Sequence, residues 1–492
     1  MGSGGSAQPG VGTALAAFAL RGTWCHHLDV GAAGSEVEVV HAVDVDDAVR
    51  ARAEQILRRH GRACTSFQTL GAGFSYLFSA DAYVAFRAIG HAWVAAGAPI
   101  ADESRGLEVA LDFVREARAQ KRRPSFFCVD AGFPDADELA RLDVGEEPFY
   151  EPAHWEQTLR ARRSLREQLR RARAKGVVVT RASAEEVAEG APLRSELSAL
   201  AERWLAGRKM APMTFLVQVE PFTRAESRAY FVARRAGEVV GLLVAVPVYA
   251  ADGYLVEHAF RDASAPNGTV ELLFDAAIRG LGEEGAQFVS AGLCPLSGAV
   301  LPVLKTAARL GQGLYNFEGL HAFKAKLGPD RWQPARLLWP RRTSPLVAML
   351  DTLRAFTPGG FTRFAIDTLR HLRRSVLRAL YLPLVIWTLA VAVAPERFFP
   401  WPSLRWIWVS LDLLLVLLLA GLVRRPSERA LTALVWLSGF DALLSVAHVA
   451  LWIGPRAEAA LDLLGLVVGL VGPTSAFILL SVLRGRRRRV SV

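Results

Sequence analysis

The chain divides into two regions by the pattern of its apolar residues. Between residues 35 and 340, charged and apolar segments alternate at helix and strand periods, which is typical of a globular protein. Between residues 376 and 483, Leu, Val, Ala and Trp dominate. The pattern therefore predicts a globular region followed by a membrane-embedded region, and 492 residues are enough for two or three domains.

The globular region repeats one order of predicted elements. From about Val37 to Tyr150 the pattern gives a helix, three strands, a helix and a further strand. From about Gly176 to Trp339 it gives a strand, helices, three strands, a helix over 269–284 and another strand. We therefore expect an α/β (α+β) fold built by internal duplication, with one unit at 35–155, a second at 176–340 and a disordered tail at 1–34.

Four apolar segments, at 376–394, 404–423, 431–453 and 461–483, are each long enough for a helix that crosses a hydrocarbon core of about 30 Å. If the first helix enters from inside, eleven arginines flank the inner ends and three flank the outer ends. Because arginines are retained on the cytoplasmic side, we expect a multi-pass protein of the cell (inner) membrane with both termini and the globular region in the cytoplasm. Residues 376–492 would then form four transmembrane helices with a basic tail.

Two further features belong to this membrane region. The segment 341–375 carries seven arginines among Leu, Val and Phe, so we expect it to lie on an anionic leaflet. Asp412, Asp441 and His448 fall inside the apolar segments. They either hydrogen-bond between helices or contact a lipid headgroup, and the first reading is favoured.

A strongly basic helix is predicted over residues 156–175, between the two units. At 3.6 residues per turn one face is apolar and the other cationic. The apolar face holds Leu165, Leu169 and Ala172, and the cationic face holds Arg163, Arg166, Arg170 and Arg173. A surface helix built for stability mixes charges of both signs, but here acids are nearly absent after the first residue. The pattern therefore favours a face that binds a polyanion, either RNA or anionic lipid headgroups, over a face that is merely solvated.

The second unit contains a candidate site at the start of its long helix. A strand runs into the loop RDASAPNG, and Asn267 and Gly268 have the geometry to cap the helix that begins at Thr269. We expect its first N–H groups to be exposed and to bind a phosphate or an oxyanion. The Q/R-x-x-G-x-G/A loop with which N-acetyltransferases hold coenzyme A is absent, so coenzyme A is not predicted.

A second helix start follows in the segment YNFEGLHAFKAKLGPDRW. It carries Tyr315 and Asn316 before the helix and Lys324 and Lys326 within it. The two lysines flank Ala325 and cannot share a helical face, so at most one is expected to point into a pocket. Tyr315 and Asn316 are equally well explained as packing and helix-capping residues.

These motifs together resemble the phosphatidylglycerol lysyltransferase family, the catalytic half of bacterial lysyl- and alanyl-phosphatidylglycerol synthases. The likeness rests on SLREQLRRARAKG, on the APNG–helix segment with GLCPLSG, and on YNFEGLHAFKAKLGPDRW, and it covers about residues 37–340. It implies tandem acetyltransferase-like (GNAT) domains joined by a basic helix. It also implies transfer of an aminoacyl group from charged tRNA to the hydroxyl of an anionic phospholipid such as phosphatidylglycerol.

The resemblance also implies roles for individual residues. Glu257 is expected to handle the proton or hold the substrate amino group, and Arg261 with Lys324 or Lys326 to meet a phosphate or the oxyanion. Asn267, Gly268, Thr269, Tyr315 and Asn316 are expected to bind substrate, and the four arginines of the basic helix the tRNA or lipid phosphate. Two motifs depart from the family: its Gly-Asp-Pro reads Gly97-Ala98-Pro99, and its Asp-Leu-Met-Arg reads Glu257-His258-Ala259-Phe260 with Arg261 one place later.

Neither a metal site nor a cofactor is predicted, beyond aminoacyl-tRNA as co-substrate, because the four cysteines are scattered without metal-binding spacing. Two rival functions stay open. One is an acyl- or aminoacyltransferase that acts on a peptide or amine, and the other is a non-catalytic, membrane-tethered protein that binds tRNA or lipid. The expected partners are aminoacyl-tRNA, anionic phospholipid and the membrane, and homo-oligomerisation is left open.

Overall fold

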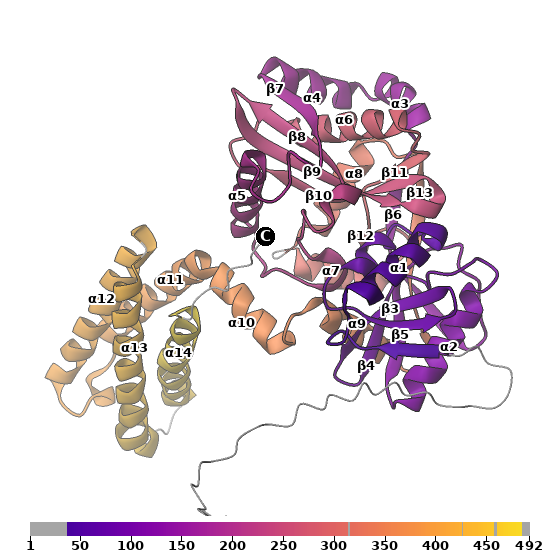
Figure 1. Ribbon diagram of the computed structural model, residues 1–492. Coiled ribbons are helices and arrows are strands. Elements are labelled where there is room, and N and C mark those ends of the chain that lie inside the picture. The colour runs from indigo at the N-terminus through magenta and orange to yellow at the C-terminus, as the bar shows by residue number, and fades with distance from the viewer. Residues whose placement is uncertain (1–36, 313–314, 426, 457–459, 485–492) are drawn as a thin grey trace, which may run out of the picture.

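The computed structural model describes residues 37–312, 315–425, 427–456 and 460–484. Two α/β halves lie against each other, and a helical bundle follows them (Figure 1). The predicted tail at 1–34 and the basic C-terminal tail after Arg484 lie outside the described residues.

Apart from its first strand, which the pattern did not predict, the first half follows the predicted order of strands and helices. Its elements are β1 (Val37–Val40), α1 (Asp47–His60), β2 (Ser75–Ser79), β3 (Ala82–Ile89), β4 (Ala92–Ala96), α2 (Gly106–Ala119) and β5 (Arg123–Val129). Strands β1 to β4 pair antiparallel, and β5 returns parallel to β4. The crossover is made by α2, which buries Val109, Phe113 and Ala117 against the sheet.

The second half repeats this order. Its elements are β7 (Val177–Ala182), α5 (Pro192–Ala206), β8 (Ala229–Arg235), β9 (Glu238–Val248), β10 (Gly253–Arg261), α6 (Thr269–Glu283) and β11 (Phe288–Ser290). Alternating residues of β8 face opposite layers: Phe231 packs towards α6, and Tyr230 packs towards α5. Strands β10 and β11 are parallel but pair over only three residues, from Gly253 to Leu255.

Two strands are exchanged between the halves, and the sequence pattern predicted neither of them. Strand β6 (Leu139–Tyr150) comes from the N-terminal part of the chain and pairs with β11 of the second half. Strand β13 (Arg331–Pro340) comes from the end of the second part and pairs with β5 of the first half. Because β6 and β13 also pair with each other, both halves share one continuous sheet.

The predicted basic helix at 156–175 is interrupted. The chain forms α3 (Trp155–Ala161) and α4 (Arg163–Ala174), separated at Arg162, whose φ of −104° and ψ of 79° are not helical. The predicted apolar face is confirmed, since Leu165, Leu169 and Ala172 are buried. In Figure 1, α3 and α4 lie on the end of the second half that is opposite the first half.

After β13 the chain forms helices that lead into the bundle. They are α9 (Pro345–Phe356), α10 (Phe361–His371), α11 (Arg373–Ala392), α12 (Pro402–Arg424), α13 (Glu428–His448) and α14 (Ala460–Arg484). Three segments are long and apolar enough to span a membrane: Ser375–Ala392, Pro402–Arg424 and Glu428–Ile453. They match the first three predicted spans. The fourth predicted span falls in α14, whose apolar part Gly469–Arg484 is shorter, so it stays a prediction.

Candidate active site

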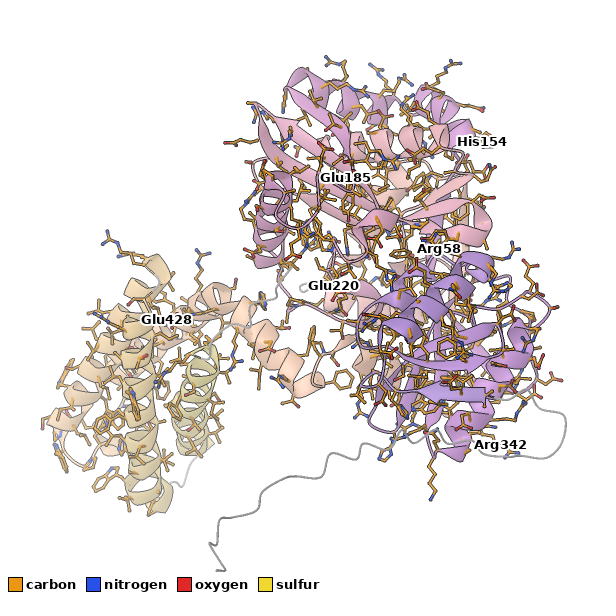
Figure 2. The ribbon with its side chains drawn as sticks, viewed as in Figure 1. Arg58, His154, Glu185, Glu220, Arg342 and Glu428 are labelled. Atoms are coloured by element: carbon orange, nitrogen blue, oxygen red, sulfur yellow. The ribbon has the colours of Figure 1, made fainter. Side chains whose placement is uncertain are left out.

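A pocket of about 30 Å³ lies where the two halves meet. The first half contributes the short helix η1 (Phe67–Leu70), and the second half contributes η3 (Phe215–Val217), the loop after it, and strand β10. Its apolar lining includes Phe67, Leu70, Phe74, Phe215 and Leu216, and its polar lining includes Gln68, Gln218, Glu220, Arg224, Arg228 and Glu257. Figure 2 shows Glu220 at this junction.

Glu257 is the one residue of the predicted catalytic set that lines this pocket. It is the extra residue of a β-bulge, because Val256 and His258 pair with successive residues of β9. Its carboxylate is ion-paired with Arg228 and accepts a hydrogen bond from Gln68 Nε2 at 3.4 Å. Burial raises the pKa of Glu257, but the positive charge of Arg228 and the hydrogen bonds from Arg228 and Gln68 favour the ionised form, and the pKa lies below its ordinary value. The pocket therefore contains an ionised carboxylate at neutral pH.

His258 lies beside this carboxylate, with Nε2 at 3.4 Å from Glu257 Oε2. Its ring stacks on Phe260, with a distance of 5.4 Å between the ring centroids. Burial lowers the pKa of His258, so the imidazole is neutral at pH 7. The site thus combines a fixed negative charge with a neutral, buried imidazole.

Arg261 does not line the pocket and is hydrogen-bonded within the APNG loop. Its Nη2 donates hydrogen bonds to Ala265 O at 2.6 Å and to Asn267 Oδ1 at 3.2 Å, so it holds the APNG loop in shape. Gly268 has a φ of 94°, and a Cβ at this position would lie 2.4 Å from Gln168 O of α4. Thr269 is fully buried. The prediction of exposed N–H groups at this helix start is therefore wrong, because α4 covers it.

Lys326 also lies at this covered helix start. Its Nζ is 2.9 Å from Glu271 Oε1, and Glu271 is in the first turn of α6. An acid there already complements the positive end of the helix dipole, and Lys326 balances its charge. Lys326 is therefore occupied within the fold and does not line the pocket described above.

Lys324 points elsewhere from α8 (Phe317–Lys326), as the prediction about helical faces requires. Its side chain is buried, and Nζ donates to Gly292 O at 2.8 Å and to Leu293 O at 3.1 Å. Burial lowers the pKa of Lys324. Lys324 thus fixes the segment between β11 and β12 (Cys294–Pro295), and it does not line the pocket either.

Tyr315 and Asn316 adopt the roles of packing and capping residues. Asn316 Oδ1 accepts a hydrogen bond from Gly319 N at 2.8 Å and so caps α8. The ring of Tyr315 packs on Phe317, with a centroid distance of 4.7 Å.

The four arginines of the basic helix are exposed, as predicted, but they are not equivalent. Arg173 is 2.6 Å from the buried Asp275, and Arg170 is 2.8 Å from Glu167. Arg166 donates to backbone carbonyls of α3. Within the described parts of the chain, Arg163 has no acidic partner. Helix α4, which carries this cationic surface, lies on the end of the second half that is opposite the first half, away from the junction of the halves (Figure 1).

A comparison with protein families decides what this chain is related to. Residues 54–337 match the family described as "Phosphatidylglycerol lysyltransferase, C-terminal". The chain belongs to this family. The match covers both halves and the pocket between them, so a transferase of the phosphatidylglycerol lysyltransferase type is supported.

Solved structures show the same fold. The C-terminal domain of a putative lysylphosphatidylglycerol synthetase from Agrobacterium fabrum is 22% identical, with a TM-score of 0.55, over 63% of this chain and 98% of that one. L-PGS from Bacillus licheniformis is 21% identical, with a TM-score of 0.52, over 62% of this chain and 96% of that one. No curated protein matches the chain. The predicted fold class, tandem acetyltransferase-like units followed by apolar helices, is confirmed.

Within this phosphatidylglycerol lysyltransferase fold, the sequence pattern missed most of the pocket. No motif in the sequence marks Arg228, Gln68 or Glu220 as residues of the pocket. Gln68 is 189 positions away in the chain from Glu257, which it contacts. Only the pairing of the halves brings them together. Ala98, at the departure from Gly-Asp-Pro, packs against the core of the first half.

Proposed function

We propose that the chain is a membrane-anchored aminoacyltransferase that moves an aminoacyl group from charged tRNA to the hydroxyl of an anionic phospholipid such as phosphatidylglycerol. The observation that carries the proposal is the pocket between the halves of a phosphatidylglycerol lysyltransferase fold, with its buried, ionised Glu257. The apolar helices that follow the fold are consistent with a lipid acceptor.

In this reaction the lipid hydroxyl oxygen bonds to the carbonyl carbon of the aminoacyl ester. The ester bond to the tRNA ribose breaks, and the proton of the lipid hydroxyl ends on the ribose oxygen. Since the ester is already activated, the enzyme needs mainly to position both substrates and to stabilise the tetrahedral oxyanion.

Glu257 suits the binding of the substrate ammonium better than the removal of a proton. A carboxylate whose pKa is lowered is a weak base, because general bases work best with a pKa near the working pH. Arg224 and Arg228 line the same pocket, ion-paired with Glu54 and Glu257, and their remaining N–H groups are suited to stabilising an oxyanion or a lipid phosphate.

The remaining parts of the proposal concern the partners and the topology. The exposed arginines of α4 suit contact with the tRNA backbone at a distance from the pocket. The arginine bias of the membrane segments favours cytoplasmic termini and a cytoplasmic active site in the cell membrane. No cofactor takes part in this scheme.

The test uses the full chain in vesicles that contain phosphatidylglycerol, supplied with total tRNA charged with labelled amino acids. We expect a labelled lipid that extraction recovers and that does not form with deacylated tRNA and free amino acid. Glu257→Gln should abolish the labelling, whereas Glu226→Gln, an exposed carboxylate on the neighbouring η4 (Ala225–Ser227), should preserve it. If no amino acid is transferred to any lipid, the proposal fails. Label on an added peptide or amine would then favour the first rival, and binding of tRNA or lipid without transfer would favour the second.

A further inference from the structure

Helix α9, beyond the residues that match the family, has two chemically different faces. The inner face buries Ala348, Asp351, Thr352 and Ala355. The outer face exposes three leucines spaced as i, i+4 and i+7: Leu346 at 62%, Leu350 at 41% and Leu353 at 51%. Aligned, exposed leucines of this kind mark a surface that a partner covers.

The inner face fixes α9 to the first half. Arg123 donates from Nε and Nη2 to the two carboxylate oxygens of Asp351, both at 2.8 Å. Asp351 is the only acid of α9 and it is buried. Arg354 also reaches Asp351, at 3.9 Å, and its side chain is half exposed. The outer face therefore presents three leucines and this partly paired arginine.

The same helix supports a wall of the pocket. Thr214 donates its N–H to Phe356 O and its hydroxyl to Ala355 O, both at 3.1 Å. The ring of Phe356 lies edge-on against Phe215, with a centroid distance of 5.2 Å. Phe215 lines the pocket. A displacement of α9 would therefore act on the pocket through one layer of side chains, the contact between Phe356 and Phe215.

The chain also limits how far α9 is from the bilayer. Helix α9 ends at Phe356, α11 begins at Arg373, and the candidate span begins at Ser375. Because α10 takes up much of the intervening chain as helix, this connection reaches only about 40 Å. Arg342 precedes α9, and Arg363 follows it in α10. Figure 2 shows Arg342 extending from the edge of the first half.

We propose that the outer face of α9 docks on an anionic bilayer surface, with Leu346, Leu350 and Leu353 among the acyl chains and the arginines at the headgroups. An apolar stripe flanked by arginines is the pattern of an interfacial helix. Docking of α9 would hold the side of the pocket that Phe215 lines close to the lipid surface. The delivery of a lipid acceptor to the pocket rests on the proposed function, whereas the docking itself does not.

The test measures the depth of α9 in the bilayer. Leu350→Cys, in a full chain that also carries Cys25→Ser, is labelled with an environment-sensitive fluorophore and placed in vesicles of phosphatidylglycerol and phosphatidylcholine. The other three cysteines are buried. Val178→Cys, on strand β7 of the second half and 61% exposed, is the matched control. We expect nitroxide-labelled lipids to quench the label at 350 and aqueous iodide to quench the label at 178.

Two outcomes overturn the proposal. Iodide quenching at 350 as strong as at 178 means that α9 faces water, and protection from both quenchers means that a protein covers it. In a second variant, Leu346→Gln/Leu350→Gln/Leu353→Gln, α9 should lie less deeply in the bilayer, and the temperature of thermal unfolding should not change. Its transfer to vesicle-borne lipid should fall about tenfold, while transfer to a detergent-dispersed, short-chain lipid is kept. If the wild type transfers nothing, the proposed function fails, but the quenching result still decides the docking.

Discussion

Arg228→Met should destabilise the protein in a way that depends on pH. The side chains of Arg228 and Glu257 are 6% and 8% exposed, so the substitution leaves a buried carboxylate without its guanidinium partner. Removal of one partner of a buried ion pair costs about 3–5 kcal/mol. Arg234→Met is the matched control: Arg234 and Glu196 are 35% and 43% exposed at 3.0 Å, and an exposed pair contributes at most about 1 kcal/mol.

The direction of the pH effect follows from the pKa of Glu257. Its pKa in the folded protein lies below its ordinary value, so its ionised form adds stability above the ordinary pKa, and this stability is lost as the pH falls through the folded pKa. In the Arg228→Met protein, burial raises the pKa of Glu257, and the carboxyl takes up a proton as the pH falls. The difference in unfolding free energy between the two proteins should thus be largest at pH 7 and shrink near pH 4.

Chemical denaturation of the detergent-solubilised protein, followed by tryptophan fluorescence at both pH values, measures this difference. The double variant Arg228→Met/Glu257→Met should recover most of the lost stability, because an apolar pair replaces the buried charges. An equal loss for Arg228→Met and Arg234→Met at pH 7 would refute the reasoning. A loss for Arg228→Met that is unchanged at pH 4 would refute it as well.

Two other substitutions probe the packing around the site. Gly268→Ala and Gly285→Ala both place a side chain at a φ of 94°, which costs about 1 kcal/mol, but only at Gly268 would the new Cβ meet the backbone of Gln168. Gly268→Ala should therefore lower the free energy of unfolding by about 1–3 kcal/mol more than Gly285→Ala does. Equal losses would show that α4 moves away from the new side chain at no cost. Asp351→Asn removes the carboxylate that binds Arg123, so limited proteolysis should cut faster around α9; an unchanged rate would mean that the helix is held by its apolar contacts alone.

Local patterns predicted the repeated units well, because a strand such as β9 or a helix such as α6 is encoded in its own sequence. The exchanged strands were missed for a physical reason. Strand β13 contains two prolines and a register shift, and its place between β5 and β6 depends on partners far away in the chain. The pattern also could not predict that α4 packs on the start of α6, and so it assigned an open anion site to Gly268 and Thr269.

The candidate site was predictable only in part for the same reason. Glu257 was found from its motif, and the structure places it in the pocket. Its partner Arg228 lies just before β8, in a stretch that reads as an ordinary charged strand end. Lys326 is paired with Glu271, 55 positions away in the chain, so this contact has no local signal, whereas Arg261 binds Asn267, only 6 positions ahead.

The exchange of β6 and β13 has a consequence for synthesis of the protein on the ribosome. When β5 has been made, its free edge must wait for β13, about 200 residues later, before the first sheet is closed. At about 5–20 residues per second this wait lasts about 10–40 s. During that time the nascent chain carries an open strand edge, which invites pairing with other chains. Meanwhile the apolar helices that would fix the protein to a membrane have yet to be made.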